Sequence, residues 1–190
     1  GRGSNGGWIS FDTTKDDAPV VVKVGLSFTG IAGARKNLDV ETSQLGFDFD
    51  AARQALHHKW NALLQQVKVT GGTHDQQVVF YTALYHSVLD PNVIGDVDGQ
   101  YMGFDGQMHT ATDFTPYSNL SLWDTFRTQN QLVEMLSPMV AHDVDLSILA
   151  IARQQGWLPR WFLGTREGNI MTGDPITSSL VEGWSKGLLS

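Results

Sequence analysis

A single glutamate, Glu167, stands in a glycine-rich stretch between Trp157 and Asp174, and a second tryptophan, Trp161, precedes it. Loops held by a rigid scaffold carry catalytic groups unusually often. A carboxylic acid beside apolar and aromatic groups tends to keep its proton to higher pH, which suits a general acid. The pattern therefore fits acid catalysis. Taken alone, however, the local composition favours a solvated loop residue paired with Arg166.

A second candidate segment is Ser121-Leu122-Trp123-Asp124-Thr125-Phe126-Arg127. The adjacent Trp123 and Asp124 offer a sugar an apolar face and a hydroxyl acceptor together. The other interpretation is structural. In that case Asp124 caps a helix and Trp123 packs against it as a hydrophobic staple.

No metal site emerges from the residue pattern. Asp96-Val97-Asp98-Gly99 has the start of a calcium-binding loop but lacks the bidentate glutamate, so it predicts a tight turn. The six histidines show no HExxH spacing, and the absence of cysteine excludes thiolate sites and disulfides within the chain.

The composition is that of a folded protein. Of 190 residues, 41% are hydrophobic and 17% charged, which is enough to form a core. The net charge of −7 argues against a nucleic-acid partner, which needs a basic surface. No apolar run approaches the roughly 20 residues that span a bilayer, so no membrane span is expected.

The elements that must position these residues change character along the chain. Residues 8–45 are rich in β-branched residues. They predict strands at Trp8–Phe11 and Val20–Phe28, with Lys15–Pro19 as the turn between them. Two or three strands cannot bury both faces alone. We therefore expect residues 1–46 to be the end of a larger β-domain.

Helical periodicity begins at residue 47. The segment 47–72 predicts a linker helix capped by Asp48 or Asp50 and ending near Leu64. A capping box, Thr73 to Gln76, then opens a helical domain over residues 73–190. Within it we expect a hairpin around residues 101–104 and helices over 120–136 and 141–155. We expect a last helix capped by Thr177 or Ser178.

Several strings resemble glycoside hydrolase family 92, and they occur in the order and spacing of that family. They are Phe80–Ser87, Pro91–Val93, Asp96–Tyr101, Ser121–Arg127, Gly156–Trp161 and the stretch Glu167 to Gly173. Two upstream strings, Val22–Ser27 and Ala34–Leu38, resemble the end of the family's N-terminal β-sandwich. The resemblance covers about residues 20–189.

The resemblance implies an α+β fold, in which the last strands of a β-sandwich precede the first helices of an (α/α)6 barrel. It also implies a calcium-dependent exo-α-mannosidase that inverts anomeric configuration. Glu167 corresponds to the family's general acid. Trp123 and Asp124 correspond to the site of the terminal mannose, and Arg127, Trp157 and Trp161 are carried over as further substrate-binding residues.

The same resemblance places the general base and most calcium ligands after Ser190. The expected partners are a mannose-containing oligosaccharide or glycoprotein glycan and the remaining part of the same enzyme. Secretion to the periplasm or cell surface is expected on this basis as well. Asp174-Pro175 stands where the family often has histidine, which leaves linkage preference open. The other readings are a non-catalytic carbohydrate-binding or interaction fragment and a different (α/α)6 hydrolase.

Overall fold

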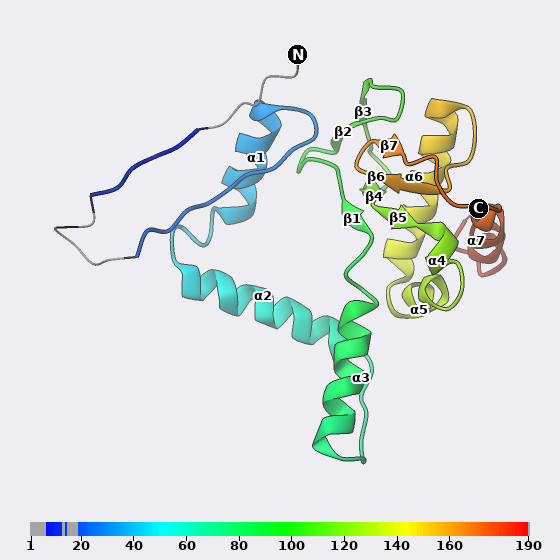
Figure 1. Cartoon of the computed structure of the whole chain (residues 1–190), viewed down its shortest axis with the longest axis horizontal. Helices are drawn as coiled ribbons and strands as arrows, with labels where there is room; N and C mark the ends of the chain where they lie inside the picture. Colours follow the sequence, from blue (N-terminus) through cyan, green and yellow to red (C-terminus); the bar gives the residue numbers. More distant parts are fainter. Residues whose placement is uncertain (1–6, 13, 15–18, 190) are drawn as a thin grey trace.

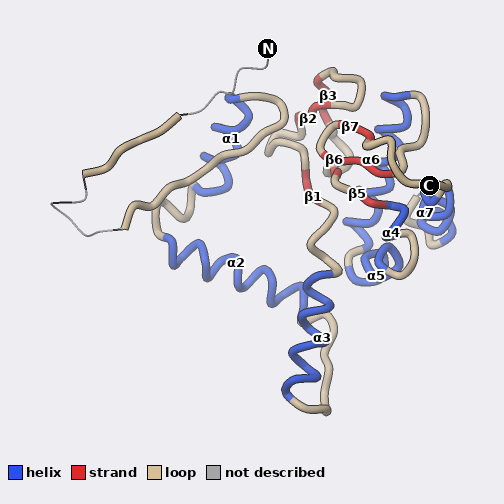
Figure 2. Tube along the Cα trace, in the orientation of Figure 1, coloured by secondary structure: helices blue, strands red, loops and turns tan. Residues whose placement is uncertain are grey.

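Helices alternate with short antiparallel strands in the computed structural model, which describes residues 7–12, 14 and 19–189 (Figures 1 and 2). The mixed helix and strand content agrees with the predicted α+β class. The helices are α1 Ile31–Thr42, α2 Phe49–Leu64, α3 His74–His86, α4 Leu122–Thr125, α5 Gln129–Leu136, α6 Pro138–Gln155 and α7 Pro175–Ser185. The strands are β1 Asn92–Val93, β2 Gln100–Met102, β3 Met108–Thr110, β4 Tyr117–Ser118, β5 Leu120–Ser121, β6 Trp161–Leu163 and β7 Arg166–Glu167.

The compact part of the molecule is built around α6. Figure 1 shows α4 to α7 gathered with the strands, while α1, α2 and α3 reach away from them. Its core brings together apolar side chains from β5, α4, α6, β6 and α7. The fully buried Phe162 stacks edge-on against Phe104, with ring centres 5.6 Å apart. The core residues are Leu120, Leu122, Ile148, Ile151, Phe162 and Ile176.

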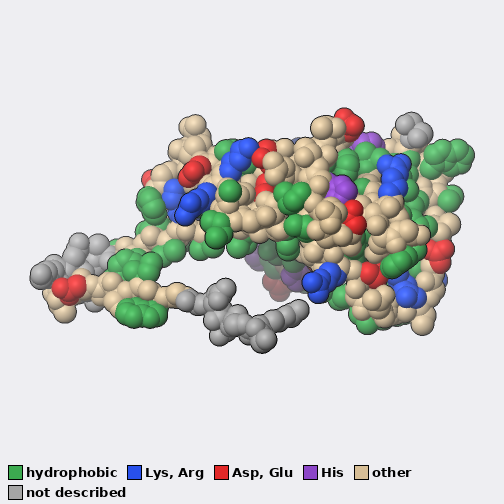
Figure 3. Space-filling model, turned by 90° about the horizontal axis from the view of Figure 1, so that it is seen from above, with side chains coloured by type: hydrophobic (Ala, Val, Ile, Leu, Met, Phe, Trp, Pro, Cys, Tyr) green, Lys and Arg blue, Asp and Glu red, His purple; other side chains and the backbone are tan. Residues whose placement is uncertain are grey.

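The N-terminal segment does not form the predicted strands. Within the described part of residues 7–28 no strand is assigned, and the predicted turn at residues 15–18 lies outside the described residues. Apolar side chains lie exposed on this thin segment, as Figure 3 shows, and Trp8 is 87% exposed. A strand needs a hydrogen-bonding neighbour, and the described chain supplies none here.

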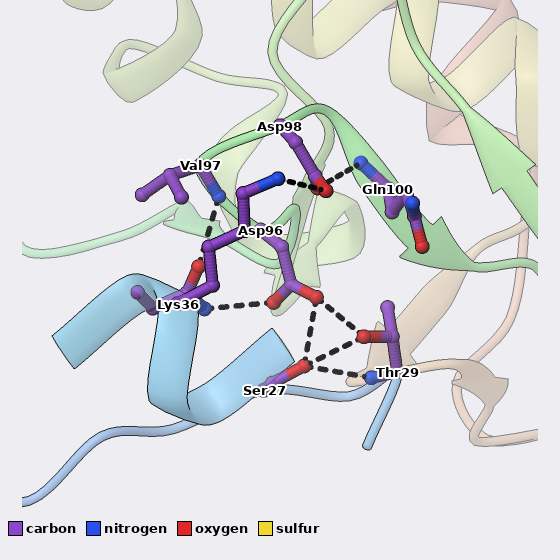
Figure 4. A network of polar contacts seen from close by, with 8 residues as sticks. Ser27, Thr29, Lys36, Asp96, Val97, Asp98 and Gln100 are labelled. Atoms are coloured by element: carbon purple, nitrogen blue, oxygen red, sulfur yellow. Dashed lines mark hydrogen bonds and ion pairs between the residues drawn. The ribbon is translucent and has the colours of Figure 1, made fainter. Parts of the chain in front are cut away.

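Helix α1 replaces the predicted β-structure at residues 31–42. It is attached to the rest of the molecule by the buried carboxylate of Asp96 (Figure 4). Asn37 of α1 donates from Nδ2 to Asp96 Oδ1 at 2.7 Å, and Ser27 donates to Oδ2 at 2.9 Å. Thr29 donates to the same Oδ2. The sequence around Asp96 is therefore a structural turn, as predicted.

Helices α2 and α3 begin where the sequence indicates. Asp48 caps α2 by accepting from the backbone N–H of residue 51, and both hydrogen bonds of the capping box at Thr73 are present. The two helices meet through Trp60 and Tyr85, whose ring centres lie 4.7 Å apart. The predicted hairpin is also present, since β2 pairs with β3 across the turn at Gly106.

The predicted single helix over 120–136 is wrong. The chain forms β5, the one-turn α4 and then α5, because Thr128 has φ 70°, which no α-helix accommodates. Helix α6 starts at Pro138 rather than residue 141, since proline suits the first helical position. Helix α7 starts at Pro175 rather than after Thr177 or Ser178. Its cap is Asp174, which accepts from the N–H of Thr177.

Candidate active site

A tight hairpin, β6 to β7, carries Glu167. Strand β6 pairs with β5 on one side and with β7 on the other, so the hairpin is fixed to the core sheet. Its turn is held from a neighbouring segment. Ser118 donates to the carbonyl of Gly164 at 2.6 Å, and the Gly164 N–H donates to Asn119 at 2.8 Å. The fully buried Phe162 anchors the hairpin to the core.

The Glu167 carboxylate is held by main-chain groups. The N–H of Arg160 donates to Oε2 at 2.8 Å. The N–H of Trp161 donates to Oε1 at 3.1 Å, and the N–H of Asn169 donates to the same oxygen at 3.2 Å. The loop folds back on itself, because Gly168 N–H donates to the Trp161 carbonyl at 2.7 Å. These contacts fix the orientation of a side chain that is only half-buried.

An open cleft of about 330 Å³ lies beside this carboxylate. It unites Glu167 with Trp157, which is 60% exposed and so has a free aromatic face. Arg160 also lines the cleft, and its buried Nε has no acceptor among the described residues. The lining residues are Trp157, Leu158, Pro159, Arg160, Glu167, Asn169, Gly173 and Asp174.

Trp161 does not line the cleft. A Cβ added at Gly168 would lie 2.6 Å from the Trp161 ring, so the loop backbone lies directly against the indole. Glycine is required at position 168 for this approach. The role of Trp161 visible here is to support the loop that follows Glu167.

The Trp123 segment adjoins this hairpin but does not line the same cleft. Ser121 pairs with Trp161 across β5 and β6, which places α4 at the end of that sheet. Trp123 is 44% exposed, and Asp124 accepts from the Ser121 hydroxyl. The Arg127 guanidinium lies over the Phe126 ring, 4.9 Å from its centre. The segment that contains Trp123 and the segment that contains Glu167 are therefore joined by the pairing of β5 with β6.

Among the polar side chains of the cleft, sequence reasoning missed Arg160 and Asn169, and it did not place Asp174 in the site. Arg160 stands between the two tryptophans that were selected, so its position was a usable signal. Asp174 is fixed by two contacts to Thr177, one from the N–H at 3.3 Å and one from the hydroxyl at 2.6 Å. That cap sets one wall of the cleft.

The described residues do not by themselves fit a metal centre. Across residues 7–12, 14 and 19–189, no three His, Asp or Glu side chains are grouped to hold an ion. Asp98, the second aspartate of the turn at Asp96, forms an ion pair with Lys36 at 2.7 Å. Within the same described residues, no helix combines the length and apolarity that a membrane crossing requires.

The structure of this chain is similar to solved structures of family GH92 mannosidases. Two solved structures from Bacteroides thetaiotaomicron match 86% of this chain at 30% sequence identity and a TM-score of 0.78. One is the family GH92 alpha-mannosidase BT3965, and the other is the family GH92 inverting mannosidase BT2199. The structure of BT3965 in complex with mannoimidazole matches 76% of the chain at 31% identity, with a TM-score of 0.69.

The glycosyl hydrolase family 92 catalytic domain matches residues 33–190, and the chain belongs to this family. No curated protein sequence matches the chain. The chain spans 22% of the length of BT3965 and of BT2199. The family membership confirms the resemblance carried by the motifs, and it supports a glycoside hydrolase of the mannosidase type.

Proposed function

We propose that this chain is part of an inverting exo-α-mannosidase in which Glu167 is the general acid. The observation that carries this proposal is the Glu167 carboxylate, held by three main-chain N–H groups at the wall of a cleft beside Trp157. These contacts bear on geometry: they fix the carboxyl beside an exposed indole, and a fixed position within reach of the proton to be transferred is the first requirement of a general acid. The substrate would be a terminal α-linked mannose of an oligosaccharide or a glycoprotein glycan.

The proposed reaction follows the inverting scheme. Glu167 gives its proton to the glycosidic oxygen while the bond from that oxygen to C1 breaks. A water molecule attacks C1 from the opposite face, and a second carboxylate takes the proton of that water. In this scheme the two carboxyl groups stand about 6.5–9.5 Å apart. We assign the base to a part of the enzyme beyond this chain, together with the barrel helices that complete the fold.

The residues around Glu167 have roles that this chemistry needs. Trp157 offers an apolar face to a pyranose ring, and the Arg160 side chain lines the same cleft. Trp123 and Asp124, at the end of the same sheet, are proposed to contact the terminal mannose, with Arg127 beside them.

Calcium dependence and secretion are further parts of the proposal, and both rest on the family resemblance. Since the described residues form no metal centre, the calcium ligands would come mainly from the remaining part of the enzyme. Mannose release should then stop when a chelator is added and return with excess calcium. Fractionation of producing cells should find the enzyme in the periplasm, on the cell surface or in the medium.

Substitution of Glu167 by glutamine in the full-length enzyme tests the assignment. We expect mannose release from a disaccharide to fall by about 10²–10⁴-fold, the usual contribution of a general acid. Release from a dinitrophenyl α-mannoside should fall far less, because that leaving group departs without protonation. The control is Glu41→Gln, the same chemical change on the exposed face of α1, which should leave both rates unchanged.

Two outcomes would contradict the proposal. Full activity in Glu167→Gln excludes the residue from the chemistry. An equal loss on both substrates indicates a role other than protonation of the leaving group. The stereochemistry has its own measurement, since the first mannose released by an inverting enzyme is the β-anomer, which NMR detects before mutarotation.

A further inference from the structure

A second cavity, of about 160 Å³, lies among α5, α6 and α7 and shares no lining residue with the Glu167 cleft. Its walls are mixed. Val133 and Ile148 contribute apolar surface, and Asp145, Thr125 and Ser179 contribute polar atoms. A cavity with both kinds of wall suits a small ligand that has an apolar body and a polar end.

Asp145 is a buried acidic residue in the lining of this cavity. It lies on α6 and only 7% of it is exposed, yet no hydrogen bond reaches its carboxylate from any described residue. Its Oδ2 faces the backbone of Gly183 on α7, where an added Cβ would lie 2.2 Å away. The hydroxyl of Thr125, which lines the same cavity, is also buried without a partner in the described chain. Buried polar atoms are normally satisfied, so unsatisfied ones facing a cavity indicate a missing partner.

The charged side chains that line this second cavity are all acidic. Asp90, Glu134 and Asp145 contribute carboxylates, and no lysine or arginine lines the cavity. Lys186 on α7 pairs with Glu134, and no salt bridge among the described residues reaches Asp145, although the charge of His142 acts on it. Burial, and then the charge of Glu134, raise the pKa of Asp145 to about 7. Near neutral pH a cation in the cavity would therefore relieve an unfavourable buried charge.

The residues that line the cavity favour an organic cation over a metal ion. A small hydrated metal ion needs several oxygen ligands, and no three acidic or histidine side chains of the described residues are grouped to hold one. Walls formed by Val133 and Ile148 favour a ligand with an apolar body. We propose that this cavity binds a small organic cation, a protonated primary amine, whose ammonium group pairs with Asp145. Its apolar body lies against Val133 and Ile148, and the Thr125 hydroxyl accepts one ammonium hydrogen.

Two ligands of equal shape and different charge test this directly. Isothermal titration of the chain with cyclohexylamine and with cyclohexanol should show the amine binding at least about tenfold more tightly. The variant Asp145→Asn should lose that preference. The control variant Asp50→Asn removes an equal charge from an exposed position on α2 and should keep it. The proposal is overturned by equal binding of alcohol and amine, by no binding of the amine, or by magnesium or calcium displacing the amine from wild-type chain.

A second variant separates binding from folding. Ala141 is buried and lines the cavity, so Ala141→Leu should fill it while Asp145 stays in place. Amine binding should be lost in a variant whose circular dichroism remains native. Unchanged amine binding in Ala141→Leu would place the ligand elsewhere and overturn the proposal, even if Asp145→Asn fails to fold.

The pH dependence gives an independent readout. Affinity for the amine should rise about tenfold between about pH 6 and about pH 8, as Asp145 loses its proton. Other ionisable groups face this site: Glu134 on α5, His142 on α6, Glu182 and Lys186 on α7, and His86 and Asp90 beyond α3. Asp145→Asn must abolish the pH slope. A slope that persists assigns it to a histidine and overturns the role of Asp145.

Discussion

Two aspartates of this protein are equally buried, with 7% of Asp96 and 7% of Asp145 exposed, but their surroundings differ. Asp96 accepts hydrogen bonds from Ser27, Thr29 and Asn37, and so joins α1 to the turn before β2. Asp145 accepts none from the described residues and faces a cavity. The comparison teaches that burial alone does not define the role of a carboxylate. The number of donors that reach it does.

The largest effect is expected when the satisfied carboxylate is removed. Asp96→Ala leaves three donors without their acceptor, and each unsatisfied buried group costs about 1–3 kcal/mol. We expect a loss of about 3–5 kcal/mol in the free energy of unfolding, since partly exposed Ser27 and Thr29 regain water. Urea denaturation followed by circular dichroism measures it. A loss below about 1 kcal/mol would show that the network does not hold α1.

The unsatisfied carboxylate should instead make stability depend on pH. The pKa of Asp145 rises from an ordinary value of 3.8 to about 7 in the folded chain. The unfolded chain therefore loses this proton first, and stability falls as pH rises from about 4 to about 7. The loss reaches up to about 4 kcal/mol, because each pKa unit corresponds to about 1.4 kcal/mol. Unfolding curves at several pH values should show this slope in wild type and a flatter one in Asp145→Asn.

A pair of glycine substitutions sharpens the comparison. An added Cβ would lie 2.2 Å from Asp96 Oδ2 at Gly33, and 2.2 Å from Asp145 Oδ2 at Gly183. The Asp96 carboxylate is held by its donors and cannot turn aside, so Gly33→Ala should cost about 1–3 kcal/mol of stability. No hydrogen bond from a described residue holds the Asp145 carboxylate, so Gly183→Ala should cost less. Equal losses in thermal unfolding of the two variants would contradict this difference.

The smallest effect is expected at the exposed edge of the Asp96 network. Lys36 pairs with Asp98 at 2.7 Å, but about half of the lysine side chain is exposed to solvent. Exposed ion pairs contribute little and are screened by salt. Lys36→Gln should therefore barely change the midpoint of thermal unfolding, and added salt should remove what difference there is. A large loss at high salt would mean that this pair, too, carries the junction.

Capping residues and helix-ending glycines predicted several helix ends correctly. The caps at Asp48 and Thr73 are present, and Gly156 ends α6 in the left-handed conformation as expected. The N-terminal region was misread, because its alternating residues are typical of a strand and pairing is not a local property. Helix α1 depends on contacts such as Asn37 to Asp96, which join positions 59 residues apart.

The candidate site was predicted in part. Glu167 and Trp157, both selected from the sequence, line one cleft in the structure. Trp161, Trp123, Asp124 and Arg127 lie around the same sheet but outside that cleft, because the pairing of β5 with β6 decides their positions. No local pattern shows that Ser121 opposes Trp161. The role of each residue in catalysis stays a prediction until the variants are measured.

The three donors to Glu167 are all main-chain N–H groups, and this has a consequence for how the enzyme can diverge. Side chains at positions 160 and 169 can be exchanged without removing any of these hydrogen bonds, provided the loop keeps its course. Gly168, which packs on the Trp161 ring, maintains the conformation of this loop. New specificities can therefore evolve in the cleft while the acid stays in place.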